Sequence, residues 1–198
     1  MKKILLSLII LFFGINHLSF AQNSSTDYSK IPSDFVYKNQ NFYKLPYAYN
    51  ALEPYIDKET VMIHYDRHHK AYFTKFIDAF DGKKIPSIEE ILQNISKYSD
   101  VVRNNAGGYY NHILYWQIMK PGGSNIPTGK LANEIDKKFG NFENLKKLIS
   151  EAALSKFGSG WAWLSVKSNG ELFISTSSNQ DNPLMDISTD VAQPLLGI

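Results

Sequence analysis

Apolar residues recur with the spacing of α-helices through much of the chain that precedes Gly158. Over residues 58–80 the apolar and aromatic side chains return every three or four positions, which predicts a long helix that ends at Asp81-Gly82. A second long helix is expected over about residues 99–119, because Pro121-Gly122-Gly123 then stops the pattern.

Shorter helices are expected between and after these two. Ser87-Ile88-Glu89-Glu90 has the form of a capping box, so a short helix should run from there to about Lys97. Residues 131–139 and 142–157 predict two further helices, with Gly140 between them and Asn141 as the N-cap of the second.

The pattern changes to that of strands after Gly160. Residues 161–166 and 171–176 favour strands, and Asn169-Gly170 between them is a strong hairpin signal. Residues 194–198 resemble the start of a third strand. The expected fold class is α+β. A helical-hairpin domain over residues 43–120 precedes an α/β domain over residues 128–198, whose small antiparallel sheet has an incomplete third strand.

The first 21 residues have the form of a secretory signal peptide. Lys2 and Lys3 precede an apolar run over residues 4–13, and Ser19-Phe20-Ala21 is a small-x-small cleavage site. The apolar run is too short to span a membrane, so we expect an exported protein, periplasmic or extracellular, with no membrane contact after the signal is removed. Residues 22–42 are polar and predict a tether.

Charge and cysteine content exclude some functions. The chain has 21 lysines and arginines against 19 acidic residues, so removal of Lys2 and Lys3 leaves 19 of each. A chain with neither a basic excess nor a basic run is a poor partner for nucleic acid. Cysteine is absent, so a metal ion would be held by imidazole, carboxylate or water.

Candidate chemistry begins in the first long helix. Residues 63–72 contain three of the five histidines of the chain. His64, His68 and Tyr72 are spaced i, i+4 and i+8, so they share one face of a helix. The alternative is a solvated helix with incidental histidines, because pairs of histidines at this spacing are common.

The second long helix carries another histidine, His112, among the apolar residues 113–116. A histidine in such surroundings is either a satisfied core residue or a functional one. Gly107 and Gly108 lie in the interior of the same helix, where each is less favourable than alanine by about 1 kcal/mol. This destabilisation predicts that a bulky group approaches the helix one turn before His112.

Four ordered motifs resemble the iron/manganese superoxide dismutases over residues 45–198. They are the run from His64 to Tyr72, R-N-N-A-G-G-x-x-N-H-x-x-x-W over residues 103–116, F-G-S-G-W-A-W over residues 157–163, and S-N-Q-D-N-P-L-M over residues 178–185. The resemblance implies superoxide as substrate and one manganese or iron ion per subunit, with His64 and His112 as ligands. It also implies a homodimer or homotetramer.

The resemblance implies further roles around the metal. His68 and Tyr72 would gate the substrate funnel and relay protons, and Gln180 would hydrogen-bond the metal-bound solvent. Three tryptophans would wall the pocket: Trp161, Trp163 and Trp116. Iron-type members supply a glutamine from the position of Gly108, so this chain resembles the manganese type. Gly107 and Gly108 would together make room for Gln180.

Part of the family pattern would follow the last residue given. Residues 194–198 match the positions just before a D-x-W-E-H-A-Y-Y motif, which carries the last two family ligands. Two hypotheses follow: an incomplete copy of an intact superoxide dismutase, or a truncated non-catalytic remnant with weak or no metal binding. A third reading, a zinc hydrolase that uses His64 and His68, is weaker because Tyr65 stands where an H-E-x-x-H motif requires glutamate.

Overall fold

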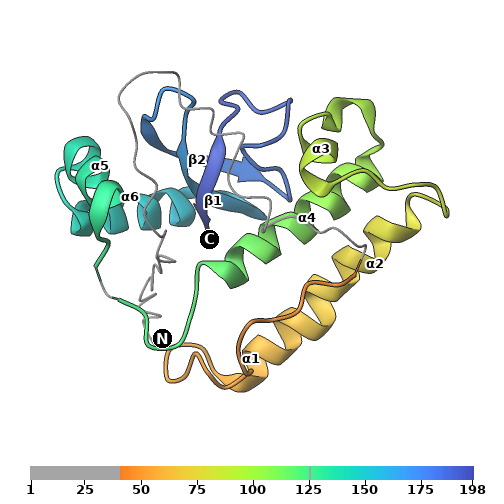
Figure 1. Cartoon of the computed structure of the whole chain (residues 1–198), viewed down its shortest axis with the longest axis horizontal. Helices are drawn as coiled ribbons and strands as arrows, with labels where there is room; N and C mark the ends of the chain where they lie inside the picture. Colours follow the sequence, from red (N-terminus) through yellow and green to blue (C-terminus); the bar gives the residue numbers. More distant parts are fainter. Residues whose placement is uncertain (1–40, 125) are drawn as a thin grey trace.

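Two long helical segments lie antiparallel and form the expected hairpin (Figure 1). The computed structural model describes residues 41–124 and 126–198, so the predicted signal peptide and residues 22–40 of the predicted tether lie outside the described residues. The first segment is continuous through α1 (Lys58–Ile63), η3 (His64–His69) and α2 (Lys70–Asp78). The second segment is α4 (Asp100–Gln117). Between them lie α3 (Ile88–Leu92) and the short 3-10 turn η4 (Ile95–Lys97).

The middle of the first segment, η3, is a π-helix, whereas the sequence predicts a regular α-helix. A π turn contains one residue more than an α turn, and such turns are frequent at functional sites. The wider turn changes the direction in which the side chains point. His68 and His69 are neighbours in sequence, and both lie against the ring of His112, with centroid distances of 4.9 and 5.5 Å.

Two helices, α3 and α6 (Phe142–Ser155), begin at the N-caps that the sequence predicts. The Ser87 hydroxyl accepts a hydrogen bond from the backbone N–H of Glu90 at 3.2 Å. The Asn141 side chain accepts one from the N–H of Asn144 at 2.8 Å. Each such cap stabilises a helix by about 1 kcal/mol, because it satisfies a donor that has no partner within the helix.

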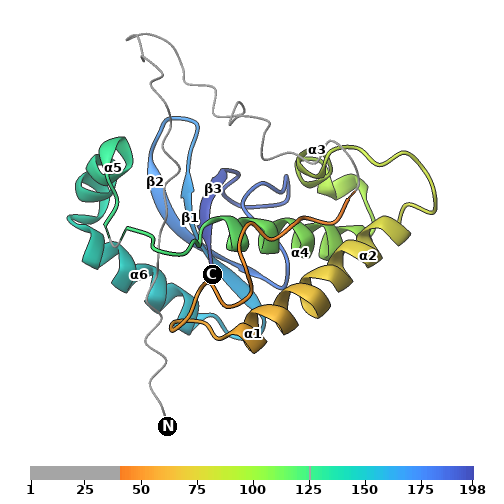
Figure 2. The same cartoon turned by 60° about the horizontal axis from the view of Figure 1, so that its bottom comes forward.

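The second half of the chain builds a three-stranded antiparallel sheet in the order β2-β1-β3 (Figure 2). Its elements are α5 (Gly129–Phe139), α6 (Phe142–Ser155), β1 (Gly160–Val166), β2 (Leu172–Ser178) and β3 (Gln193–Gly197). The predicted hairpin is confirmed, and Gly170 in its turn has a φ of 86°, which glycine adopts without strain. The strand predicted as incomplete is present, and it pairs with β1 from Trp163 opposite Gly197 to Val166 opposite Gln193.

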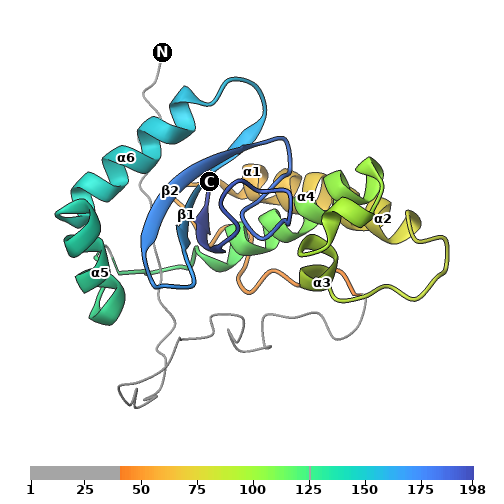
Figure 3. The same ribbon diagram turned by 90° about the horizontal axis from the view of Figure 1, so that it is seen from above.

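Three apolar cores hold these elements together. One lies among α2, α3 and α4 and includes Leu184 and Met185 from the loop before β3. A second lies between the sheet and the pair α5 and α6, which lie along one side of the strands (Figure 3). A third joins the segment around Leu45 and Leu52 to α1 and to Trp116 of α4. Because α4 also contacts β3, it is the element through which the helical hairpin meets the sheet.

Two glycines allow the closest approaches to α4. A Cβ atom on Gly107 would overlap the backbone carbonyl oxygen of Gln180, and one on Gly108 would lie 2.5 Å from the ring of Tyr72. The predicted bulky approach is therefore present, but two different groups make it. The expectation that both glycines make room for Gln180 is wrong for Gly108, because the Tyr72 ring occupies the space beside it.

Among the helices in residues 41–124 and 126–198, none combines the length and the apolar character that crossing a membrane requires.

Candidate metal centre

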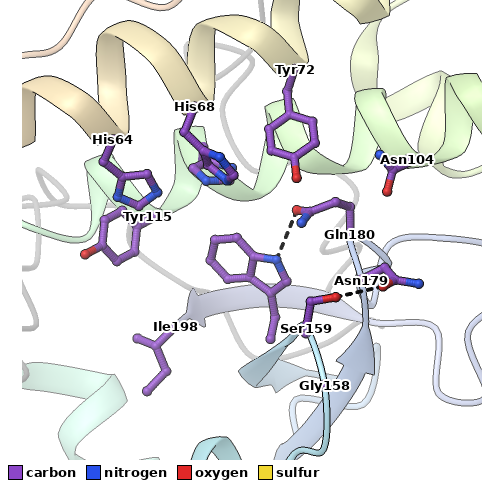
Figure 4. Close-up of a pocket in the computed structure, with 13 residues that line it drawn as sticks. His64, His68, Tyr72, Asn104, Tyr115, Gly158, Ser159, Asn179, Gln180 and Ile198 are labelled. Atoms are coloured by element: carbon purple, nitrogen blue, oxygen red, sulfur yellow. Dashed lines mark hydrogen bonds between the residues drawn. The ribbon is translucent and has the colours of Figure 1, made fainter.

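A pocket of about 520 Å³ opens between η3, α4 and the sheet (Figure 4). Residues from both halves of the fold line it: His64, His68, Tyr72, Asn104, His112, Tyr115, Gly158, Ser159, Gly160, Trp161, Asn179, Gln180 and Ile198. The pocket therefore collects every predicted site residue except Trp116 and Trp163.

Three imidazoles converge in this pocket. His64, His68 and His112 each offer one ring nitrogen, and these nitrogens all lie within 4.8 Å of one another. His112 is buried, His64 is half-buried and His68 is exposed. In the part of the chain that the structure describes, no other group of three or more potential ligands is found. Imidazole nitrogen binds first-row transition metals, so the donor set fits a metal ion.

The ring of His112 is held in one orientation. Its Nδ1 lies 2.6 Å from the carbonyl oxygen of Gly108, one turn earlier in α4. A carbonyl oxygen can only accept a hydrogen bond, so Nδ1 carries the proton and the lone pair remains on Nε2. Proteins commonly fix the tautomer of a ligating histidine through such a bond. His112 is thus prepared to bind a metal through Nε2.

Burial keeps these histidines neutral. Burial, together with the smaller effect of the nearby His68, lowers the pKa of His64 to about 4. Burial lowers the pKa of His112 to about 3, against the opposing effect of the bond to Gly108. Burial also lowers the pKa of His68. A metal ion requires the unprotonated imidazole, so at neutral pH each of these rings offers a lone pair.

His69 belongs to the site, and sequence reasoning missed it. Its side chain is fully buried, and its ring stacks on that of His112 with an interplanar angle of 17°. Trp116 donates its Nε1–H to Nδ1 of His69 at 3.1 Å. On a regular α-helix His69 would point away from the face of His64, so the sequence pattern gave no signal for it. The π turn brings it behind His112, where it supports the ring.

Trp116 and Trp163 lie behind the pocket wall, contrary to the prediction that they form part of it. Only Trp161 of the three tryptophans lines the pocket, with its ring edge-on to His112 at 5.3 Å. Trp163 is fully buried and stacks on Trp161 at 5.4 Å, because side chains two residues apart on a strand share a face. Trp116 is also buried and lies 5.0 Å from the ring of His64. Each of these two tryptophans supports a residue that does line the pocket.

Gln180 and Tyr72 enter the pocket from different elements, and their side chains point toward one another (Figure 4). Gln180 comes from the loop after β2, and its Oε1 accepts a hydrogen bond from Nε1 of Trp161 at 3.1 Å. This bond leaves the side-chain amide N–H groups of Gln180 as donors. Tyr72 comes from α2, edge-on to His68 at 5.0 Å. Burial raises the pKa of Tyr72, so its hydroxyl keeps its proton at neutral pH.

The chain is similar to known proteins over almost all of its described length. Residues 39–120 match the family described as iron/manganese superoxide dismutases, alpha-hairpin domain, and residues 127–198 match the family described as iron/manganese superoxide dismutases, C-terminal domain. A superoxide dismutase (Mn) 1 from Leptolyngbya boryana is 39% identical over 201 residues, which cover 96% of this chain and 80% of that protein. Superoxide dismutases (Mn) from Listeria innocua and Listeria monocytogenes are 44% identical over 162 residues, which cover 78% of this chain and of each relative.

We predict that the metal-free protein loses stability as the pH falls from about 6.5 towards 4, the interval between the unfolded and the folded pKa of His64. Below pH 6.5 the unfolded state binds more protons than the folded state, because the folded pKa values of His64 and His112 are about 4 and about 3. Each such histidine lowers the free energy of unfolding by at most about 1.4 kcal/mol per pH unit. Urea titrations of the metal-free protein at several pH values in this interval measure the slope.

The control for this prediction is the substitution His69→Asn. Burial lowers the pKa of His69 to about 2, so this residue adds to the slope. Asparagine still offers Trp116 an acceptor but does not titrate, so the variant should lose stability less steeply than the wild type. Equal slopes for the two proteins would contradict the assignment of the pH dependence to buried histidines.

Proposed function

Because the chain belongs to the iron/manganese superoxide dismutase family, it is a superoxide dismutase that uses manganese or iron, and we propose that His64 and His112 hold the metal ion. The observation that carries this proposal is the bond from Nδ1 of His112 to Gly108, which leaves Nε2 for a metal. His64 provides the second nitrogen of the cluster and is supported by Trp116 behind it.

The reaction converts two superoxide anions and two protons into dioxygen and hydrogen peroxide. When bound, the metal supplies the change of oxidation state that this exchange of electrons requires. The side chains of the pocket supply protons and confine the substrate. Tyr72 keeps its proton at neutral pH, and its neighbour His68 is exposed to solvent. We propose that protons enter through His68 and Tyr72, which are in ring contact.

We propose manganese as the metal in the cell. The relatives from Leptolyngbya and Listeria are named as manganese enzymes. In this chain the pocket glutamine is Gln180, from the loop after β2, and Tyr72 fills the space beside Gly108. A longer side chain at Gly108 would have to displace that ring. This arrangement therefore favours the manganese type of the family.

The position of His68 favours a role beside the metal over a role as a ligand. It is the exposed member of the cluster, and it lies next to Tyr72 at the open side of the pocket. The zinc hydrolase reading required His68 as a ligand. That reading falls with the family assignment, because the chain belongs to a redox family.

We predict that His64→Ala and His112→Ala each abolish manganese binding and superoxide removal, whereas His68→Ala keeps the metal and loses only part of the activity. Loss of a ligand should exceed the effect of about 10- to 100-fold that is typical when a hydrogen-bond partner of a ligand is removed. Elemental analysis of the purified variants gives the metal content, and superoxide removal per bound metal ion gives the activity.

The circular dichroism spectrum of each variant shows whether it has folded, so that lost binding is not confused with a lost fold. Full manganese occupancy in His64→Ala would contradict the ligand assignment. Loss of the metal from His68→Ala would also contradict it, and would favour a site that uses all three imidazoles. Removal of superoxide by the wild type at the rate of free manganese alone would contradict the activity of this chain.

We propose that a second copy of the chain covers the apolar surface next to the pocket. Phe157 is 97% exposed and Leu154 is 87% exposed. The two residues after Phe157, Gly158 and Ser159, line the pocket. An exposed apolar patch of this kind marks an interaction site. The family resemblance implies a homodimer or homotetramer, so a copy of this chain is the partner that fits best.

We predict that Phe157→Ser shifts the protein towards monomer, because it removes the most exposed apolar side chain from this patch. Sedimentation equilibrium over a range of protein concentrations measures the association. The matched control is Ile126→Ser, which changes a 65% exposed apolar residue in the loop before α5. An identical association constant for Phe157→Ser and the wild type would contradict the proposed interface.

We also propose that the protein is exported and cleaved after Ala21, on the strength of the basic, apolar and small-residue regions of its first 21 residues. N-terminal sequencing of the protein from its own cells should find Gln22 as the first residue, in the periplasmic or extracellular fraction. Leu6→Arg interrupts the apolar run and should leave the uncleaved protein inside the cell. An intact Met1 on cytosolic wild-type protein would refute export.

A further inference from the structure

The conformation of the loop of residues 178–182 determines the position of the Gln180 side-chain amide in the pocket. The side chain of Gln180 has one hydrogen bond from the described protein, which it accepts from Trp161. A glutamine side chain has three rotatable bonds, so one contact at its tip fixes its position only if the backbone beneath it is also held. The interactions of the residues that follow Gln180 are therefore part of the site.

Arg103 of α4 forms an ion pair with the loop. Its Nε donates to Oδ1 of Asp181 at 2.8 Å, and its Nη2 donates to Oδ2 at 2.6 Å. Two parallel hydrogen bonds from a planar guanidinium to a carboxylate fix orientation as well as distance. Asp181 directly follows Gln180, so this ion pair sets the backbone direction at the base of the glutamine side chain. The two side chains are 40% and 28% exposed, so the pair is partly shielded from water.

Asn111, also in α4, forms hydrogen bonds with the same loop. Its Nδ2 donates to the backbone carbonyl oxygen of Gln180 at 3.1 Å, and its Oδ1 accepts from Nδ2 of Asn182 at 2.9 Å. Asn111 and Asn182 are both buried. Residues 180, 181 and 182 are therefore each bonded to α4, the helix that carries His112. Gln180 and His112 are therefore both held in place by the same helix, α4.

The charge of Arg103 is not free to attract a substrate. Its guanidinium is occupied by the carboxylate of Asp181, and Arg103 does not line the main pocket. It lines a smaller hollow next to that pocket, together with Asp100 and Asp181. An arginine whose charge is paired with a carboxylate adds no net positive field that would draw in an anion. Its contribution is geometric.

We infer that Arg103 and Asp181 are a positioning pair for Gln180: by fixing the loop on α4, they set the placement of the glutamine amide relative to His64 and His112, and through it the reduction potential of the metal. This inference rests on the role that the family resemblance implies for Gln180, which we propose for this chain: a hydrogen bond to the metal-bound solvent. Groups that bond to the atoms around a metal tune its potential, and small displacements weaken such bonds steeply.

The test compares Arg103→Gln with the wild type in the full-length, manganese-loaded protein. Mediated redox titration measures the reduction potential, and stopped-flow kinetics measure kcat and kcat/KM at several salt concentrations. We expect a shifted potential and a kcat reduced about three- to tenfold, less than the loss of about 10- to 100-fold on removing a direct partner of a ligand. The salt dependence of kcat/KM should not change. Arg103→Lys keeps one charged donor and should recover part of the potential shift.

The matched control is Lys138→Gln. It removes the ion pair between Lys138 of α5 and Glu171, the residue before β2. The two side chains are 40% and 45% exposed, and neither lines the pocket. It should lower thermal stability about as much as Arg103→Gln and leave the reduction potential unchanged. If Arg103→Gln does not fold, Asp181→Asn breaks the same pair from the other side.

The outcomes distinguish a failure of the positioning pair from a failure of the role of Gln180. If Gln180→Asn leaves the reduction potential unchanged, the proposed role of Gln180 is wrong. If Gln180→Asn shifts the potential and Arg103→Gln does not, the positioning pair is refuted while the function of Gln180 stands. An Arg103→Gln protein with a lower melting temperature and an unchanged potential would show the pair to be merely structural. A weaker salt dependence of kcat/KM with an unchanged potential would show Arg103 to be a steering charge, and would refute the inference.

Discussion

The metal site depends on the close contact between α4 and the loop that follows β2. Gly107 has no side chain, so the carbonyl oxygen of Gln180 can lie against the helix, where a Cβ atom would overlap it. Gly108 leaves room for the ring of Tyr72 in the same way. Two glycines in a helix interior lower its intrinsic stability by about 1 kcal/mol each, so tertiary packing must offset this loss. In return, one turn of α4 receives a group from the loop after β2 and a group from α2 close to His112.

Local signals in the sequence predict most of the helices and strands, but they do not predict the contacts between residues that are far apart in the chain. The capping serine at Ser87 and the turn at Asn169-Gly170 act within a few residues, so their outcomes follow from the sequence alone. The family motifs likewise point to most of the residues around the pocket. The π turn at His64–His69 is different, because the spacing of apolar residues there predicts a regular α-helix. The hydrogen bond from Trp116 to His69 joins residues 47 positions apart, and the Arg103–Asp181 ion pair joins residues 78 positions apart. No local pattern in the sequence predicts either contact.

Burial of imidazole gives the pocket its electrostatic character. Among its described lining residues there is no aspartate or glutamate, and the histidines are neutral at neutral pH because desolvation lowers their pKa values. An anion that enters therefore meets no negative side chain on the way to the three rings. The carboxylate of Asp181, which follows the pocket residue Gln180, is paired with Arg103. A pocket whose lining carries no negative side chain suits a small anionic substrate.

The run of residues 103–116 shows why this site is encoded so compactly. One helix meets three different neighbours, and each neighbour requires a different chemistry from it. Towards the core it presents Ala106 and Ile113, which are buried. Towards the loop after β2 it presents the guanidinium of Arg103, the amide of Asn111 and the bare backbone of Gly107. Towards the pocket it presents His112, whose proton is directed onto the carbonyl of Gly108 within the same helix. A substitution that suits one neighbour disturbs another, because the three faces share a single backbone within four turns.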